Sequence, residues 1–316
     1  AVRYREVDSN GEISGGPMYY IEKGLGEKWK PLAILFAVFG VLTACLGSGT
    51  YTQANAIMSS LEVSFGIAPL MTDVVLTILV GIIILGGLQS IAKAAEKIVP
   101  AMAVVYIVAV ISLLIINREQ LPMAIELVFV NAFTPTAAMG GFLGASVMKG
   151  IQSGIARGIF SNESGLGSAP IVAAAAKTKW SAEQGLISMT GTFIDTIIIC
   201  TMTGLAVISS GLWTTELNGA VLTNGAFSQA FPLFGDYLIT IALVLFAFTT
   251  ILGWSYYGER CAVYLFGTKV IKPYRLVFIA IIATAAFLKL EEIWALADIV
   301  NGLMAFPNLV ALLLLS

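Results

Sequence analysis

Two adjacent hydroxyl groups inside a long apolar run have the chemistry to bind a small cation. Thr249 and Thr250 lie in "LVLFAFTTILGWSYYGER", residues 243–260. Hydroxyl and carbonyl oxygens are the ligands that small, hard cations take in proteins. The alternative is that each hydroxyl donates to the backbone carbonyl one helical turn earlier, as threonine commonly does in helices. Trp254 follows one turn after Thr250 and could line an apolar pocket or anchor the helix at a membrane interface.

A second polar cluster lies in "TACLGSGTYTQANAI", residues 43–57. Thr50 and Gln53 are three residues apart, so a helix would present them on one face. The small residues 47–49 permit close packing between helices. A buried glutamine amide needs several hydrogen-bond partners. Either a polar substrate or an unwound neighbouring segment could supply these partners to Gln53.

The segment 132–154, "AFTPTAAMGGFLGASVMKGIQSG", combines apolar residues with helix breakers. Pro135 lacks a backbone donor, and Gly140, Gly141 and Gly144 weaken a helix. Transporters use such discontinuous helices to expose backbone groups to a substrate or cation near the midplane of the membrane. The sequence therefore predicts a broken helix here, and a kinked helix with small residues at a packing seam is the alternative.

Two carboxylates lie within apolar runs, Asp195 in "GTFIDTIIIC" and Asp298 in "ALADIVNGL". A charge at membrane depth is costly and usually functional. Capping of a helix end, or a hydrogen bond between helices, is the alternative for both. Glu259 and Arg260 close an apolar run, and we expect them to pair at the membrane interface.

A glycine-rich polar stretch, "GIARGIFSNESGLGSAP", interrupts the apolar sequence at residues 154–170. Asn162 and Glu163 in this stretch could form an inner gate with Arg157 or Arg260. Alternatively, Ser161 or Asn162 caps a helix whose first turn includes Glu163. We expect the cap.

The composition indicates which elements must position these groups. The 316 residues are 58% hydrophobic and 11% charged, with a mean hydropathy of +0.91, whereas soluble domains are about a quarter charged. A helix crosses a bilayer in about 20 residues. We therefore predict an all-α, polytopic bundle over residues 32–316, preceded by a segment with an amphipathic helix over residues 1–31. The eight predicted spans are 32–58, 74–91, 99–116, 128–155, 184–210, 236–257, 275–289 and 292–316.

The basic residues predict the orientation of this bundle. Of the 17 lysines and arginines, 14 lie before the first span or in alternate connections, and only Arg118 and Lys289 lie in the opposite ones. Positive residues concentrate on the cytoplasmic side of membrane proteins. Residues 1–31 and the connection 157–180 are therefore expected in the cytoplasm.

Several classes of function are disfavoured. The chain contains no histidine, which excludes histidine-based triads, zinc helices and proton relays within it. Cys45, Cys200 and Cys261 lie in or beside apolar runs without the spacing of a metal site. No basic patch suggests binding to nucleic acid. An enzyme is thus not expected. The chain begins without methionine and ends inside an apolar run, so we expect a longer protein.

Four segments resemble the alanine or glycine:cation symporter family, prokaryotic sodium-coupled amino-acid transporters. They are "GEISGGPMYYIEKGLG", "ARGIFSNESGLGSAP", "FTTILGWSYYGERCAVYLFG" and "LADIVNGLMAFPNL", and together they extend over essentially the whole chain. The resemblance implies the inverted-repeat fold of the LeuT type in the amino-acid–polyamine–cation superfamily. The eight spans would then be core helices 3–10, with the first two core helices lying outside this sequence.

The resemblance also implies sodium-coupled uptake of a small neutral amino acid, alanine or glycine, across the inner membrane of a prokaryotic cell. Sodium would be the coupling ion, held by Thr249 and Thr250. The substrate-binding candidates are Thr50, Gln53, Met139, Gly140, Gly141, Phe142 and Trp254. Proton coupling through Asp195 is the main alternative, and a channel, a receptor or an intramembrane enzyme built on Ser164 is less consistent with these residues.

Overall fold

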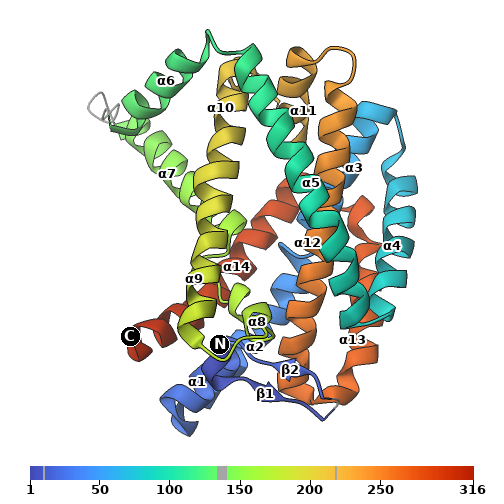
Figure 1. The fold of residues 1–316 in the computed structure, drawn as a ribbon, viewed down its shortest axis with the longest axis vertical. Helices are drawn as coiled ribbons and strands as arrows, with labels where there is room; N and C mark the ends of the chain where they lie inside the picture. Colours follow the sequence, from blue (N-terminus) through green and yellow to red (C-terminus); the bar gives the residue numbers. More distant parts are fainter. Residues whose placement is uncertain (10, 134–140, 218) are drawn as a thin grey trace.

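The structure, a computed structural model, describes residues 1–9, 11–133, 141–217 and 219–316. Figure 1 shows long helices side by side, with a short strand pair at the end of the bundle that also holds the N-terminus. The strands are β1 (Glu6–Val7) and β2 (Ile13–Ser14). The first helices are α1 (Pro17–Leu25), α2 (Lys30–Leu46), α3 (Tyr51–Phe65), α4 (Pro69–Leu85) and α5 (Leu88–Ile116).

The remaining helices complete the bundle. Those of the middle part are α6 (Leu121–Phe133), α7 (Gly141–Asn162), α8 (Ala169–Ala173), α9 (Ser181–Phe193), the π-helical η4 (Ile194–Cys200) and α10 (Thr201–Ser210). Those of the last part are α11 (Gly219–Ala230), α12 (Gly235–Phe266), α13 (Ile271–Ile282), the 3₁₀ turn η7 (Ala285–Phe287) and α14 (Leu290–Leu315). Several of them begin with proline, as at Pro17 and Pro69. Proline lacks a backbone N–H, and in the first turn of a helix that N–H would have no helical partner in any case.

Six helical stretches are long and apolar enough to cross a membrane. They are Glu27–Phe65, Leu88–Ile116, Ser181–Ser210, Gly235–Phe266, Thr268–Phe287 and Glu291–Leu315. Each overlaps one of the eight predicted spans, which confirms a multi-pass helical membrane protein. The predicted span 74–91 corresponds to the shorter apolar helix Pro69–Leu85.

The predicted span 128–155 is not one continuous helix in the described residues. Helix α6 ends at Phe133, and α7 begins at Gly141. Pro135, Met139 and Gly140 lie outside the described residues, so the predicted break stays a prediction.

The N-terminal segment contains two short strands, which the all-α prediction did not include. Strands β1 and β2 pair antiparallel, with Glu6 opposite Ser14. Helix α1 follows, with all of residues 17–21 buried and Lys23 exposed. This segment is therefore packed onto the bundle and contains the small sheet that the sequence analysis missed.

Helix α12 is the centre of the packing and contacts α2, α3, α5 and α11 (Figure 1). Glycines allow the closest approaches. A Cβ on Gly258 would lie 2.1 Å from the hydroxyl of Tyr274 and 2.6 Å from the Cβ of Ala44. Helices α2, α12 and α13 thus meet at a point where only hydrogen fits.

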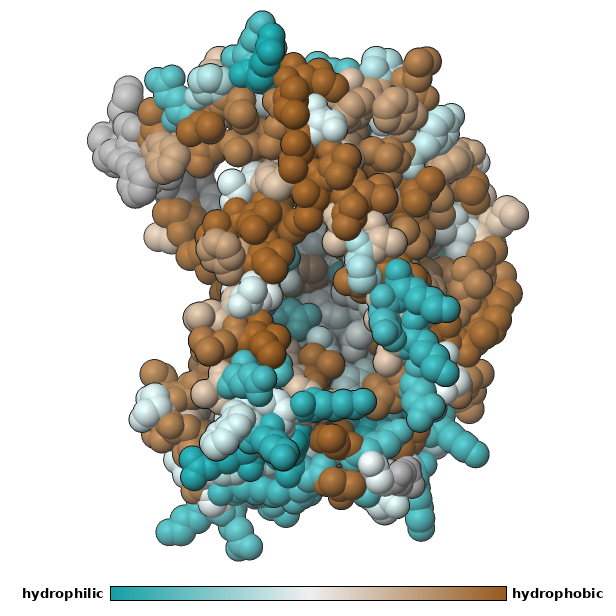
Figure 2. Space-filling view, in the orientation of Figure 1, coloured by the Kyte–Doolittle hydropathy of each residue, from teal (hydrophilic) through white to brown (hydrophobic). Residues whose placement is uncertain are grey.

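The surface divides into an apolar part and a charged end. Figure 2 shows hydrophobic residues over the upper part of the molecule and a concentration of hydrophilic residues at the lower end, where β1, β2 and α1 lie. Large apolar side chains of the α9–α10 stretch are exposed, including Leu186 at 62% and Met189 at 62%. Apolar surface of this extent marks contact with lipid or with another protein segment.

Replacing Gly258 with alanine is expected to destabilise the protein by about 1–3 kcal/mol, the usual cost of overpacking. The added methyl group would displace Tyr274 or separate α12 from α2. The measurement is the thermal unfolding of the purified protein in detergent. Gly253, also in α12, is the matched control because a Cβ there meets nothing within 4 Å. Equal melting temperatures for Gly258→Ala and Gly253→Ala would contradict the expectation.

Candidate functional site

The first predicted span is interrupted in its middle. Helix α2 ends at Leu46, and α3 begins at Tyr51. Gly47 (φ −120°, ψ −126°) and Thr50 (φ −131°, ψ −72°) both leave the helical conformation. The predicted span 32–58 lies within the apolar stretch Glu27–Phe65, but it is not one continuous helix, because four residues of the apolar run do not continue the helix.

Two other helices enclose this break. A Cβ on Gly49 would lie 2.6 Å from the Cβ of Trp254 on α12, and a Cβ on Gly47 would lie 2.6 Å from a methyl group of Val300 on α14. The Ser48 hydroxyl donates to the Oδ1 of Asn301, also on α14, over 2.8 Å. The small residues at 47 and 49 are thus required by close contact with α12 and α14.

Gln53 binds the break itself. Its Nε2 donates to the carbonyl oxygen of Ser48 over 3.2 Å, and the hydroxyl of Thr52 donates to the same oxygen over 3.2 Å. Thr50 is fully buried, and its hydroxyl donates to the carbonyl of Cys45. The side chains of the predicted cluster therefore satisfy backbone carbonyls that the break leaves without a helical partner.

Thr249 and Thr250 lie on α12, one turn before Trp254. Thr249 donates to the carbonyls of Leu245 and Phe246 at 3.0 Å each, and Thr250 donates to the carbonyl of Phe246 at 2.8 Å. Both hydroxyls thus make the hydrogen bond to the preceding turn that the sequence offered as the alternative to cation binding. It uses the hydroxyl hydrogens, and the oxygen lone pairs are still able to accept a ligand.

The structure brings some substrate-binding candidates together and leaves others open. Thr50, Gln53 and Trp254 all lie at or beside the break between α2 and α3. Gly141 is the first residue of α7, and the side chain of Phe142 is not among the described ones.

A cavity of about 420 Å³ lies between α7 and α14. Its lining includes Arg157 from α7 and Asp298 and Asn301 from α14. Asn301 also contacts Ser48 in the break, so this cavity adjoins the break. Its volume falls within the range of small-molecule sites, about 300–1,000 Å³.

Arg157 joins α7 to α14 at this cavity. One guanidinium nitrogen lies 2.5 and 2.6 Å from the two carboxylate oxygens of Asp298. The guanidinium carbon also lies 4.2 Å from the ring centroid of Trp294. Asp298 thus forms the inter-helix contact that was the alternative to a functional role.

A second polar cluster joins the end of α7 to η4. The Ser161 hydroxyl lies 2.9 Å from each carboxylate oxygen of Asp195, and the Asn162 amide donates to the hydroxyl of Thr196 over 2.8 Å. Asp195 lies in a π-helical stretch, a local distortion that is frequent at functional sites. The sequence analysis singled out Asp195 and missed the distortion.

Glu163 directly follows α7 in the left-handed conformation, with φ 55°. The expected cap is wrong: the next helix, α8, begins only at Ala169, and Asn162 instead accepts a hydrogen bond from the Ser164 amide over 2.9 Å. Burial raises the pKa of Glu163, and the negative charge of Asp195 raises it further. A 2.7 Å hydrogen bond from Ser168 lowers it, and the resulting pKa is about 7. Glu163 can therefore change charge near neutral pH.

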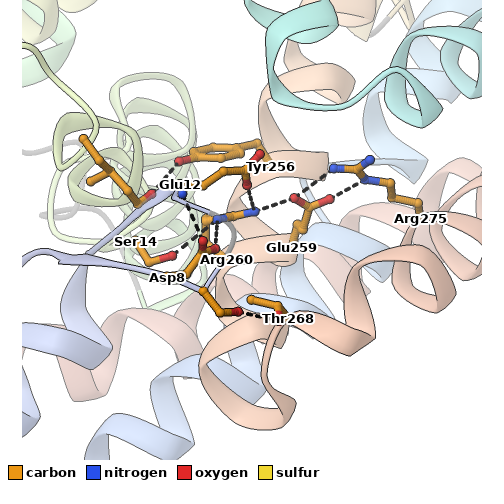
Figure 3. Close-up of polar contacts among 10 residues, drawn as sticks. Asp8, Glu12, Ser14, Tyr256, Glu259, Arg260, Thr268 and Arg275 are labelled. Carbon is orange, nitrogen blue, oxygen red and sulfur yellow. Dashed lines mark hydrogen bonds and ion pairs between the residues drawn. The ribbon is translucent and has the colours of Figure 1, made fainter.

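Arg260 is the centre of a buried ionic network (Figure 3). The side chain is fully buried, and its guanidinium contacts Glu12 at 2.7 Å, Glu259 at 2.7 Å and Asp8 at 3.1 Å. Glu259 also binds Arg275 of α13 at 2.6 Å. The predicted pair of Glu259 and Arg260 is confirmed, but it is buried and holds the β1–β2 hairpin against α12 and α13.

The four predicted gate residues fall into separate clusters. Arg157 pairs with Asp298, whereas Arg260 pairs with Asp8, Glu12 and Glu259. Asn162 binds Thr196 of η4, and Glu163 accepts a hydrogen bond from Ser168. Within the described ranges, the ion pairs do not connect Glu163 to either arginine, and the gate stays a prediction.

Asp8 and Glu12 are site residues that the sequence analysis missed. They flank the turn of the hairpin, and an Asp-Ser-Asn-Gly-Glu sequence is a turn signal. Their pairing with Arg260 could not be predicted from the sequence, because Asp8 and Glu12 precede Arg260 by 252 and 248 residues.

Comparison with known proteins identifies relatives over the whole chain. The model of the sodium:alanine symporter family matches residues 1–316. An uncharacterized transporter of Haemophilus influenzae is 56% identical over 315 residues, which are 99% of this chain and 69% of that protein. The sodium/alanine symporter AgcS of Methanococcus maripaludis is 47% identical over 100% of this chain and 70% of its own length. The probable sodium/glutamine symporter GlnT of Bacillus subtilis is 39% identical over 99% and 64%.

Replacing Arg260 with methionine is expected to cost about 3–5 kcal/mol of stability, since buried carboxylates would lose their counter-charge. The measurement is thermal unfolding in detergent. Lys23→Met is the control, because the Lys23–Glu6 pair has side chains 36% and 51% exposed, and such pairs contribute at most about 1 kcal/mol. Comparable destabilisation by the two substitutions would show that the Arg260 network is not a major source of stability.

The raised pKa of Glu163 predicts a pH-dependent stability. Between the ordinary value of 4.5 and about 7 the folded protein holds the proton more tightly than the unfolded chain, so stability falls as pH rises through this window. Glu163→Gln removes the titrating group and is expected to flatten this part of the profile of melting temperature against pH. Glu216→Gln, at an exposed position, should leave the profile unchanged. A Glu163→Gln profile as steep as that of the wild type would contradict the assignment.

Proposed function

Because the chain belongs to the sodium:alanine symporter family, a family of transporters, we propose that it imports a small neutral amino acid, alanine or glycine, together with sodium. The observation that carries this proposal is the break between α2 and α3, enclosed by α12 and α14. Non-helical backbone at membrane depth is tolerated where it is buried in protein or lines a cavity. Such backbone is the usual ligand of substrate and ion in secondary transporters.

The substrate would bind at this break. An amino acid carries a carboxylate, an ammonium group and a side chain. The carboxylate would meet backbone amides at the predicted break near Gly140 and Gly141, where the positive end of α7 favours an anion. The ammonium would meet carbonyl oxygens at the break near Thr50 and the amide oxygen of Gln53. The small apolar side chain would contact Trp254, with Met139 and Phe142 as the other candidate walls.

Sodium would bind at the hydroxyls of Thr249 and Thr250. Both hydroxyl hydrogens are used within α12, so each oxygen is oriented with lone pairs directed away from the carbonyl it binds. Because these oxygens are held in place by the helix, ion binding would require little reordering of side chains. The sodium gradient would drive uptake if the ion binds the outward-facing state better than the inward-facing state.

The placement in the membrane follows from the charge pattern. Residues 1–31 and the Arg260 network would face the cytoplasm of a prokaryotic cell, and the helices would cross its cell membrane. The fold would be the LeuT-type inverted repeat, with this chain supplying core helices 3–10. The inner gate would involve Arg157, Asn162, Glu163 and Arg260, whose clusters would separate or rearrange when the site opens inward.

Proton coupling through Asp195 is a second candidate. Its support is the environment of Asp195, which lies in a π-helical stretch and binds Ser161 at the end of α7. The negative charge of Asp195 also contributes to the raised pKa of Glu163. Uptake would then follow the pH gradient in place of the sodium gradient.

The decisive experiment is uptake of labelled alanine into proteoliposomes, with and without an inward sodium gradient. We expect sodium-dependent uptake that falls at least about tenfold in the Thr249→Ala, Thr250→Ala double variant, which corresponds to a loss of about 1.4 kcal/mol or more in ion binding. Unlabelled glycine, D-alanine and glutamine are added as competitors to define the substrate.

Thr190→Ala is the matched control, because Thr190 makes the same kind of backbone hydrogen bond on an exposed helix face. Sodium-dependent uptake that survives in the double variant would remove the ion from α12. Uptake that ignores sodium, follows pH and is lost in Asp195→Asn would favour the proton-coupled alternative.

A further inference from the structure

Asp73 is a buried carboxyl group outside every cluster described above. It lies in the second turn of α4 and is 1% exposed. Its Oδ2 accepts one long hydrogen bond, 3.4 Å from the amide of Ala286 beside α4, and its Oδ1 is buried without a hydrogen-bond partner. A buried polar atom without a partner is uncommon in folded proteins, so the state of this carboxyl group needs a physical explanation.

Three hydroxyl groups on α4 and on the preceding helix α3 are also without hydrogen-bond partners. The oxygens of Ser60, Thr72 and Thr77 are buried and make no hydrogen bond. Most threonines at comparable helical positions donate to a carbonyl one turn earlier, as Thr203 does over 2.7 Å. These three hydroxyls therefore remain free to donate or accept within the fold.

Their positions lie close to that of Asp73. Thr72 is its neighbour, and Thr77 is one turn further on the same face of α4. Ser60 lies on α3, which is joined to α4 by residues 66–68 only. Helices α3 and α4 contact each other.

No positive charge compensates an ionised Asp73 within the described part of the chain, since none of its ion pairs includes this residue. The elements that contact α4 are α3, α5, α12, α13 and η7. Their acidic and basic residues are Glu62 on α3; Lys93, Glu96 and Lys97 on α5; Asp236, Glu259 and Arg260 on α12; and Lys272 and Arg275 on α13. Arg275 lies beside Gly87, past the opposite end of α4, and binds Glu259.

A carboxylate in this position would be a buried charge with one weak donor, which is strongly unfavourable. A proton on Oδ1 removes the charge and supplies the hydrogen that this oxygen lacks, and it requires only one acceptor. The hydroxyl of Thr77 makes no hydrogen bond with Asp73 in this structure, so a change of rotamer would be needed for its oxygen to be this acceptor. A bound metal cation would instead need several oxygen ligands around an open space.

We propose that Asp73 is a proton-binding site that keeps α4 packed against the segment of Ala285–Phe287. Loss of the proton would leave an unpaired charge between the two and loosen their contact. The site is separate from Thr249 and Thr250 and does not depend on the transport function proposed above. Because Asp73 lies near the end of α4 opposite to Arg275 and the basic connection 86–97, the proton would exchange with the outer side of the membrane.

The direct test is infrared spectroscopy of the purified protein near neutral pH. A protonated carboxylic acid has a C=O stretch that is separate from the bands of carboxylates. We expect one such band to be lost in Asp73→Asn and kept in Glu119→Gln, a control at an exposed carboxylate. A spectrum in which Asp73→Asn removes only carboxylate absorption would overturn the proposal.

The second test separates a proton from sodium. Melting temperatures are measured from about pH 4, near the pKa of an unfolded aspartate, to alkaline pH in sodium chloride and in choline chloride, for the wild type, Asp73→Asn and Glu119→Gln. We expect the wild type to lose stability as the pH rises in both salts, while Asp73→Asn, which mimics the neutral acid, loses less. Stabilisation of the wild type by sodium that disappears in Asp73→Asn would assign the site to a metal cation and reject the proton.

Discussion

Backbone groups within a bilayer must be hydrogen-bonded by the protein itself, and this constraint shapes the centre of the molecule. The chain leaves the helical conformation at residues 47–50, where each unpaired backbone group would cost several kcal/mol in hydrocarbon. Side chains meet this demand: Thr52 and Gln53 donate to Ser48, and Thr50 donates to Cys45. Helices α12 and α14 then exclude lipid from the break. The small residues, the buried hydroxyls and the close packing of α12 are thus consequences of one interruption.

The positions of the long apolar helices could be predicted from the sequence. Six of the predicted spans correspond to long apolar helices, because hydropathy over about 20 residues depends on composition and not on tertiary contacts. The break at residues 47–50 escaped prediction because its residues also occur in continuous membrane helices. The cap expected at Asn162 was wrong because the chain after α7 turns at Glu163 instead of starting a helix. Local signals could not distinguish these outcomes, which depend on what packs against the segment.

The candidate site shows the same division. The types of residue at Thr50, Gln53 and Trp254 indicated a polar cluster at membrane depth, and the structure places them around one break. The sequence could not pair Arg157 with Asp298, or Arg260 with Asp8 and Glu12, because partners far apart in the chain are fixed only by the packing of helices. As a result the residues grouped as one gate occupy separate clusters. Each cluster joins two elements: α7 to α14, α7 to η4, and the hairpin to α12.

The pairing of the hairpin with Arg260 has a consequence for biosynthesis. Asp8 and Glu12 leave the ribosome long before Arg260, which is 252 and 248 residues later in the chain. At about 5–20 residues per second, this interval is of the order of ten seconds or more. The hairpin must wait in water, with its acids solvated, until α12 has inserted and can bury its arginine. Final docking of the N-terminal segment is therefore a late event in assembly, and it closes the bundle only after its central helix is in place.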